Sequence, residues 1–189
     1  MSAYLLVIGD RQALGWILTT GRMAFSQPLR SEPRRLASRD TLVLYTTRGC
    51  FKNPSRDRGR VIGEATVISA PERAADPLVI GDRAFPFLCD LKLTKLAALG
   101  SGPELAEQVP QLHALNASGR GWATRLRRPL VPLDEHDVAH LRSLPDYPNG
   151  RPTPRLIAPY ARWAPHIDVE SHQRTGHAAP GPSTVSAHH

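Results

Sequence analysis

The residues with the clearest chemical potential in this sequence are its arginines, which number 21 against 3 lysines. Residues 11–60 hold eleven basic and three acidic side chains, a net charge of +8, and residues 120–128 add four arginines without an acid. Such concentrated basic stretches predict a polyanionic partner, and arginine favours planar contacts with phosphates or base edges. A general bias from lysine to arginine is the alternative explanation of the ratio, but it accounts less well for the clustering.

Aromatic side chains lie among these basic residues, and aromatic rings that stack on bases beside cations that neutralise phosphates make a nucleic-acid site. Phe51 and Trp122 are the stacking candidates, whereas Trp16 and Tyr45 fit a base pocket or the core equally well. The candidates for contacts with a nucleic-acid backbone are Arg22, Arg34, Arg35, Arg48, Lys52, Arg56, Arg58, Arg60, Arg120, Arg125, Arg127 and Arg128.

Motifs for catalysis, cofactors or metals are scarce. No phosphate-binding loop, dinucleotide-binding glycine pattern or nucleophile elbow occurs. His136 and His140 have a spacing that metals can use, but a solvated helix face is the favoured interpretation because the glutamate of H-E-x-x-H is lacking. Cys50 lies in a basic loop that could lower its pKa, but no histidine is near it in the sequence to act as the partner of a catalytic thiol. Cys89 lies in an apolar strand and is expected to be a core residue. The sequence favours a binding protein without cofactor or metal over an enzyme.

Length and composition limit the class of protein. The 189 residues, 41% of them hydrophobic, suit one domain with a tail. No apolar run reaches 18 residues, and the N-terminus has no secretory pattern. Two cysteines are too few for a disulfide framework. We expect a cytoplasmic, nucleoid-associated protein with no membrane partner.

Short elements must position these residues, because the chain has 18 prolines and 14 glycines. Apolar runs and alternation predict strands at 4–8, 41–47, 61–69, 85–93 and 121–131. A short helix followed by a loop is predicted over 11–25. Further helices are predicted in part of 103–115 and from the N-cap Asp134 to about residue 144. Polar or basic composition predicts loops at 26–40, 48–60 and 71–84.

This order of elements favours mainly antiparallel pairing, with 41–47 beside 61–69 and Gly63 at a bulge or close approach. The expected fold class is α+β: a small β-barrel with short peripheral helices and a Pro/His-rich C-terminal tail. We expect a domain over residues 1–145, an arm over 146–173 that packs on it, and a disordered tail over 174–189.

The order and spacing of several motifs resemble an EVE-type domain of the PUA-like superfamily, whose relatives are the YTH and ASCH domains. The similarity covers roughly residues 3–144. It is carried by Tyr4–Ile8 (YLLVI), Gly15–Thr20 (GWILTT), Arg39–Thr47 (RDTLVLYTT), Val61–Val67 (VIGEATV), Phe87–Leu91 (FLCDL) and Gly121–Leu133 (GWATRL through LVPL).

The resemblance implies a small PUA-like barrel with a pocket for a modified base. YTH relatives hold a methylated base in an aromatic cage, and the sequence is similar to an actinobacterial EVE-like protein that binds 5-methylcytosine DNA. Thr46 and Thr47 depart from the family, which has His-Ser there, and residues 19–25 replace its usual Arg-Asn-Tyr-Gln-Ala-Arg-Asn segment. We therefore expect the residues that contact the base in this chain to differ from those of the family.

Together these features predict a reader of DNA that contains 5-methylcytosine, which flips the base into a pocket. The expected pocket residues are Trp16, Thr20, Tyr45, Thr46 and Thr47. Two alternatives stay open. One is an RNA-binding PUA-like module, and the other is an ASCH-like amide hydrolase acting on a modified nucleoside, which would need a Lys/Glu pair in the pocket.

Overall fold

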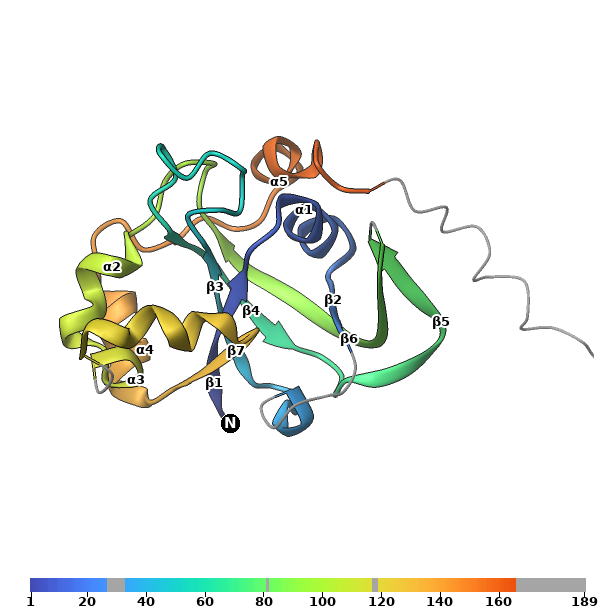
Figure 1. Ribbon diagram of the computed structural model, residues 1–189, viewed down its shortest axis with the longest axis horizontal. Helices are drawn as coiled ribbons and strands as arrows, with labels where there is room; N and C mark the ends of the chain where they lie inside the picture. Colours follow the sequence, from blue (N-terminus) through green and yellow to red (C-terminus); the bar gives the residue numbers. More distant parts are fainter. Residues whose placement is uncertain (27–32, 81, 117–118, 166–189) are drawn as a thin grey trace, which may run out of the picture.

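Seven strands form one curled sheet in the computed structural model, which describes residues 1–26, 33–80, 82–116 and 119–165. The spatial order is β2-β6-β4-β3-β1-β7, and β5 pairs with β6 (Figure 1). The strands are β1 (Ala3–Ile8), β2 (Arg22–Phe25), β3 (Thr41–Thr46), β4 (Arg60–Val67), β5 (Glu72–Ile80), β6 (Arg83–Leu96) and β7 (Leu130–Leu133).

The centre of the sheet is a parallel pair, β1 with β3, in which Leu5 lies opposite Val43. Helix α1 (Arg11–Thr20) belongs to the crossover between them. The remaining pairs are antiparallel, including β3 with β4, as the sequence predicts. Gly63 lies next to a register shift of that pair, and a Cβ there would come within 2.6 Å of the Lys95 carbonyl oxygen. The predicted close approach is confirmed.

Helix α1 has clear start and stop signals in its sequence. The Asp10 carboxylate accepts hydrogen bonds from the backbone N–H groups of Gln12 and Ala13, which makes Asp10 the N-cap. Gly21 ends the helix in the left-handed region, with φ of 64°. The helix buries Leu14 and Ile17 against the sheet and begins directly after β1.

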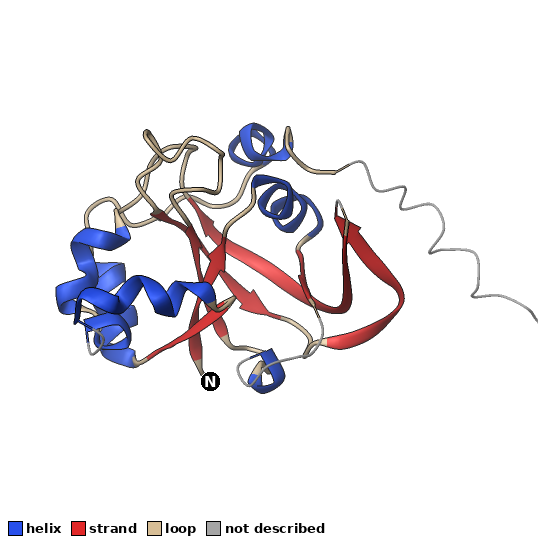
Figure 2. Ribbon diagram, viewed as in Figure 1, coloured by secondary structure: helices blue, strands red, loops and turns tan. Residues whose placement is uncertain are grey.

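The two faces of the sheet carry different layers (Figures 1 and 2). Helices α2 (Leu105–Gln108), α3 (His113–Asn116) and α4 (Glu135–Ser143), with the 3-10 segment η2 (Val109–Gln111), cover one face. Leu5, Val43 and Tyr45 point into this layer. Leu6, Ile8 and Leu44 belong to the other hydrophobic cluster, beneath α1, because successive side chains of a strand alternate between faces.

The segment after Pro145 returns to the domain. Helix α5 (Pro154–Ala161) packs on α1, and Tyr160 is fully buried. A Cβ at Gly15 would meet the backbone nitrogen of Ala164 at 2.7 Å, so a glycine permits this close approach. The rest of the expected arm, and the whole tail over 174–189, lie outside the described residues.

Three local predictions are wrong. Residues 71–84 are not a loop, because they contain β5 and the start of β6. The segment 121–131 is mostly the 3-10 segment η3 (Gly119–Arg127), with β7 only at its end. Residues 22–25, expected in a helix and loop, form β2. The helices predicted within 103–115 and after Asp134 are confirmed. No helix in the described ranges has the length and apolar character needed to cross a membrane.

Candidate nucleic-acid interface

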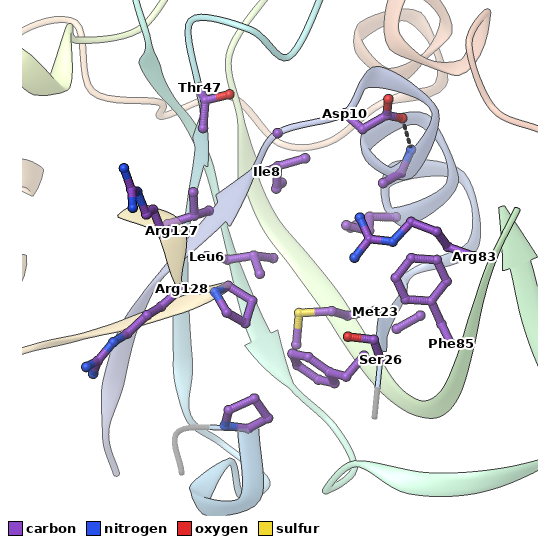
Figure 3. Close-up of a pocket in the computed structure, with 18 of the residues that line it drawn as sticks. Leu6, Ile8, Asp10, Met23, Ser26, Thr47, Arg83, Phe85, Arg127 and Arg128 are labelled. Carbon is purple, nitrogen blue, oxygen red and sulfur yellow. Dashed lines mark hydrogen bonds between the residues drawn. The ribbon is translucent and has the colours of Figure 1, made fainter. Parts of the chain in front are cut away.

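A cavity of about 940 Å³ opens on the face of the sheet that carries α1 (Figure 3). Its volume is within the range of small-molecule and cofactor sites. It lies between β1, the start of α1, β2, the start of β6 and the end of η3. The residues that line it include Leu6, Ile8, Asp10, Ile17, Met23, Phe25, Ser26, Pro33, Thr47, Arg83, Phe85, Arg127 and Arg128.

The floor of the cavity is apolar because it is the buried face of its elements. Leu6 and Ile8 are alternate residues of β1 and so point to the same side. Ile17 comes from the inner side of α1, and Met23 and Phe25 are the buried residues of β2. These side chains also belong to the hydrophobic core, which holds the floor rigid.

Phe85 and Arg83, both from the start of β6, form one wall. The Arg83 guanidinium carbon lies 5.6 Å from the Phe85 ring centroid, within cation–π range. Figure 3 shows Arg83 extending toward the middle of the cavity, beside the ring. Phe85 is half-buried, so one part of its ring packs on the core while another part faces the cavity.

Polar groups lie around the mouth. Both hydrogen bonds that Asp10 accepts as N-cap use its Oδ1 atom, at 2.7 and 3.2 Å. Asp10 lines the cavity, and its Oδ2 atom takes no part in these two bonds. Thr47 lies across from it, where its backbone N–H donates to the Ile8 carbonyl, and Ser26 follows β2. The mouth thus offers carboxylate and hydroxyl groups above an apolar floor.

Of the five predicted pocket residues, Thr47 lines the cavity. Thr46 and Tyr45 are buried elsewhere, and Tyr45 points to the helix-covered face, where burial raises its pKa to about 12. Trp16 is 6% exposed and packs in the core behind the floor. Thr20 is exposed at the far end of α1, where its hydroxyl donates to the Trp16 carbonyl. The aromatic wall of the cavity is therefore not made by Trp16 and Tyr45.

The predicted backbone contacts differ in exposure, and several of these side chains bond other groups of the protein, among them Arg48, which donates to the Pro54 carbonyl oxygen at 3.2 Å. Arg22 is exposed but bonds Asp90 at 3.1 Å, and the half-buried Arg60 bonds Glu104 at 2.9 Å and the Gly102 carbonyl at 2.6 Å. The side chain of Arg120 lies outside the described residues. Well-exposed positions are held by Arg34, Arg35, Arg48, Lys52, Arg56, Arg58, Arg125, Arg127 and Arg128.

The exposed arginines bracket the cavity. Arg34 and Arg35 follow the lining residue Pro33 before β3, while Arg48 follows the lining residue Thr47 after β3. These groups therefore precede and follow the six-residue strand β3. Arg127 and Arg128 form the mouth between them, with guanidinium groups that point away from its centre in Figure 3.

The two stacking candidates lie apart from the cavity. The Phe51 ring is 5.2 Å from the Trp163 ring, between the basic loop after β3 and the end of α5. Trp122 of η3 packs against the cluster beneath α2–α4. Cys50 is fully buried, and burial, followed by the nearby Asp10 and Asp57, raises its pKa to about 12, so the basic loop does not activate this thiol.

Sequence reasoning missed Met23, Phe25, Arg83 and Phe85 as cavity residues. The alternation of Phe85–Leu93 did place Phe85 in a strand. What concealed the site was β2, since a four-residue strand next to a helix end gives almost no periodic signal. Its pairing with β6, with Met23 opposite Cys89, brings the two phenylalanines to one cavity.

Comparisons with known proteins locate the fold. Scans against protein-family models and against curated proteins find no match. Among solved structures, protein PSPTO5229 from Pseudomonas syringae has a TM-score of 0.51 at 14% identity, over 75% of this chain and 98% of that one. Human THYN1, solved in complex with 5-methylcytosine-containing DNA, gives 0.48 at 14%, over 76% and 96%. The YTH domain-containing protein mmi1, solved with RNA, gives 0.42 at 15%, over 59% and 66%.

The similarity to PSPTO5229 shows a shared fold. The curled sheet and its short helices confirm the expected α+β fold, a PUA-like barrel. At this low identity the comparisons extend to the fold alone, so the chemistry of the site must be argued from its own residues.

Proposed function

We propose that this protein binds DNA that contains a modified base, most specifically 5-methylcytosine, and that the base is flipped into the cavity beside Phe85. The observation that carries the proposal is the position of the cavity. An apolar and aromatic hollow the size of a ligand site lies between exposed arginines that precede and follow β3. Arginines on both sides of a cavity can contact the phosphates that flank a flipped base.

The energetics of flipping suit such a site. Unstacking a base costs a few kcal/mol, and stacking on an aromatic ring returns about 1–3 kcal/mol. The exposed arginines supply affinity that does not depend on sequence. A methyl group buried against Ile17 and Met23 contributes about 0.8 kcal/mol, which is about a fourfold preference. The backbone contacts thus hold the DNA while the cavity selects the base.

Asp10 gives the cavity a means to read the base edge. Cytosine presents an exocyclic amino group, which is a hydrogen-bond donor, and carboxylates accept from it. Asp10 lines the cavity, and the two hydrogen bonds of the helix cap do not use its Oδ2 atom, so we infer that Oδ2 accepts from the base. Thymine presents a carbonyl at the same position, which a carboxylate repels. Asp10 therefore favours cytosine, and the apolar floor favours its methylated form.

We propose a binding protein and not an enzyme. An ASCH-like amide hydrolase would use a Lys/Glu pair in its pocket. Neither lysine nor glutamate is among the described residues that line this cavity. Lys95 and Glu64 do form an ion pair at 3.3 Å, but Glu64 also binds Arg142 of the helix layer on the other face of the sheet. This arrangement supports binding over hydrolysis.

Base flipping can be tested with duplexes that carry 2-aminopurine beside a 5-methylcytosine. The fluorescence of 2-aminopurine rises when its neighbour leaves the stack, so addition of the protein should increase it. Asp10→Asn should reduce the increase while it preserves the helix, since asparagine is also a good N-cap. An unchanged signal at saturating protein would contradict flipping. Competition with the matching RNA tests the alternative of an RNA-binding module, because only RNA has a 2′-hydroxyl.

A further inference from the structure

A cluster of histidine and aspartate side chains lies on the helix layer, remote in the fold from the proposed base cavity. It joins the start of α3 to the start of α4 and contains His113, Asp134, His136 and Asp137. Each residue offers one ligand atom, and these atoms all lie within 4.8 Å of one another. Nothing in the proposed DNA binding uses this cluster.

Three members are exposed and close together. His113 Nδ1 lies 2.8 Å from Asp134 Oδ2, with the two side chains 62% and 51% exposed. The rings of His113 and His136 stack with centroids 4.2 Å apart and planes inclined by 8°. Ligand atoms around a tetrahedral ion lie about 3.4 Å apart. Small rotations of these exposed side chains would therefore bring all three onto one ion.

The fourth member, Asp137, positions the others. Its side chain is 1% exposed, and its two oxygens accept from the backbone N–H groups of His113 at 2.6 Å and Ala114 at 3.0 Å. Its own N–H donates to Asp134 Oδ1 at 2.8 Å, which caps α4. These bonds fix the backbone of His113 relative to Asp134. The site is thereby preorganised across two helices, in the way outer carboxylates orient metal ligands.

We propose that His113, Asp134 and His136 bind one divalent transition-metal ion of the zinc class, with Asp137 as a positioning residue. Two imidazoles and one carboxylate match the ligand preference of such ions and not that of magnesium or calcium, which take oxygen ligands. The carboxylates of Asp134, Glu135 and Asp137 offset the positive end of the α4 dipole. The ion would join α3 to α4.

Isothermal titration of the full chain with Zn²⁺, repeated with Mg²⁺, tests the proposal. His136→Ala and Asp134→Asn should each weaken one Zn²⁺ site at least tenfold, and asparagine retains the helix cap. His140→Ala is the matched control on the same helix, because His140 instead contacts Gln108 at 3.0 Å. It should bind Zn²⁺ as the wild type does, and Mg²⁺ should not bind at this site.

The chain has eight histidines, including a pair at its end, so the variants and not the total binding identify the site. Loss of one site in His136→Ala, with circular dichroism like that of the wild type, supports the proposal. A zinc isotherm that is the same in wild type, His136→Ala and Asp134→Asn would overturn it. Equal weakening by His140→Ala would also overturn it, because that would point to a general effect on α4.

Discussion

The two faces of the sheet are built from the same strands but differ in what covers them. On one face, Tyr45 lies beneath the α2–α4 layer, and its ring packs against Gly59, where a Cβ would come within 2.7 Å of the hydroxyl. On the other face, Leu6 and Ile8 line an open cavity of about 940 Å³. The difference shows that an aromatic residue on a central strand can become core, while the aromatic wall of the cavity comes from Phe85 at the start of β6.

The two faces also differ in the exposure and the partners of their charged side chains. The covered face buries Glu64 and satisfies it with Arg142, Lys95 and the Tyr147 hydroxyl, which lies 2.8 Å away. The open face is bordered by exposed arginines such as Arg34 and Arg48. Charge on the covered face thus stabilises the fold, whereas we propose that the exposed arginines around the open face contact DNA. The predictions below separate the two roles.

The largest expected effect is on stability, from Trp16→Ala. Trp16 lies behind the cavity floor at 6% exposure, and large-to-small changes of buried aromatic residues cost about 3–5 kcal/mol. We expect urea unfolding to show this loss. Any folded fraction should prefer methylated over plain DNA as the wild type does. A selective loss of binding to methylated DNA, with stability intact, would instead restore Trp16 to a base cage.

A smaller loss of stability is expected on the covered face, from Glu64→Gln. Burial alone would raise the pKa of Glu64, but hydrogen bonds from Arg142 and Tyr147, with the charges of Arg142 and Lys95, lower it on balance. Hydrogen bonds to charged groups contribute about 2 kcal/mol. The ionised form stabilises the fold above the unfolded-state pKa of about 4.3. The stabilisation is lost as pH falls through the lowered folded-state value.

Urea unfolding of wild type and Glu64→Gln at a series of pH values checks this. The difference between them should be full at pH 7 and shrink in acid, below about pH 4. DNA affinity at pH 7 should be the same for the folded proteins. A difference that grows in acid would contradict the assigned role of Glu64.

Next in size is the effect of charge at the cavity mouth. Replacing Arg127 and Arg128 with alanine should weaken binding to methylated and plain duplexes alike, by about tenfold, because the proposed contacts are to phosphates. Each phosphate contact that is lost should also reduce the slope of log K against log salt concentration by about 0.9. Affinities measured over a series of salt concentrations check the slope. Replacing Arg22 and Arg60, whose side chains are held by Asp90 and Glu104, should change the slope less. A slope unchanged in the first variant would remove these arginines from the interface.

Much of the fold could be predicted because its signals are local. The apolar runs of β1 and β3 and the Asp134 cap are each encoded within a few residues. The strand β5 was missed because Asp76 and Pro77 within it are typical of turns, and the register shift between Arg73 and Leu78 accommodates them. Segment η3 alternates like a strand but forms 3-10 turns.

The site was harder to predict than the fold. The exposure of the arginines could be predicted from the composition and from the loop sequences, and most of the predicted arginines are exposed. Which aromatic residue faces the cavity depends on β2 pairing with β6 and on which face of the sheet the helices cover. Both features depend on contacts between residues far apart in the sequence. The sequence therefore favoured Tyr45 and Trp16, whereas Phe85 lies at the cavity in the structure.

The most direct test is a titration, at 0.15 M salt, of wild type and Phe85→Ala against one duplex with and without 5-methylcytosine. The wild type should prefer the methylated duplex by about fourfold, the contribution of one buried methyl group. Phe85→Ala should lose this preference and retain the affinity for plain DNA, because its arginines are intact. A wild type that binds both duplexes equally, or a preference that survives Phe85→Ala, would contradict the assignment of the cavity as the base-reading site.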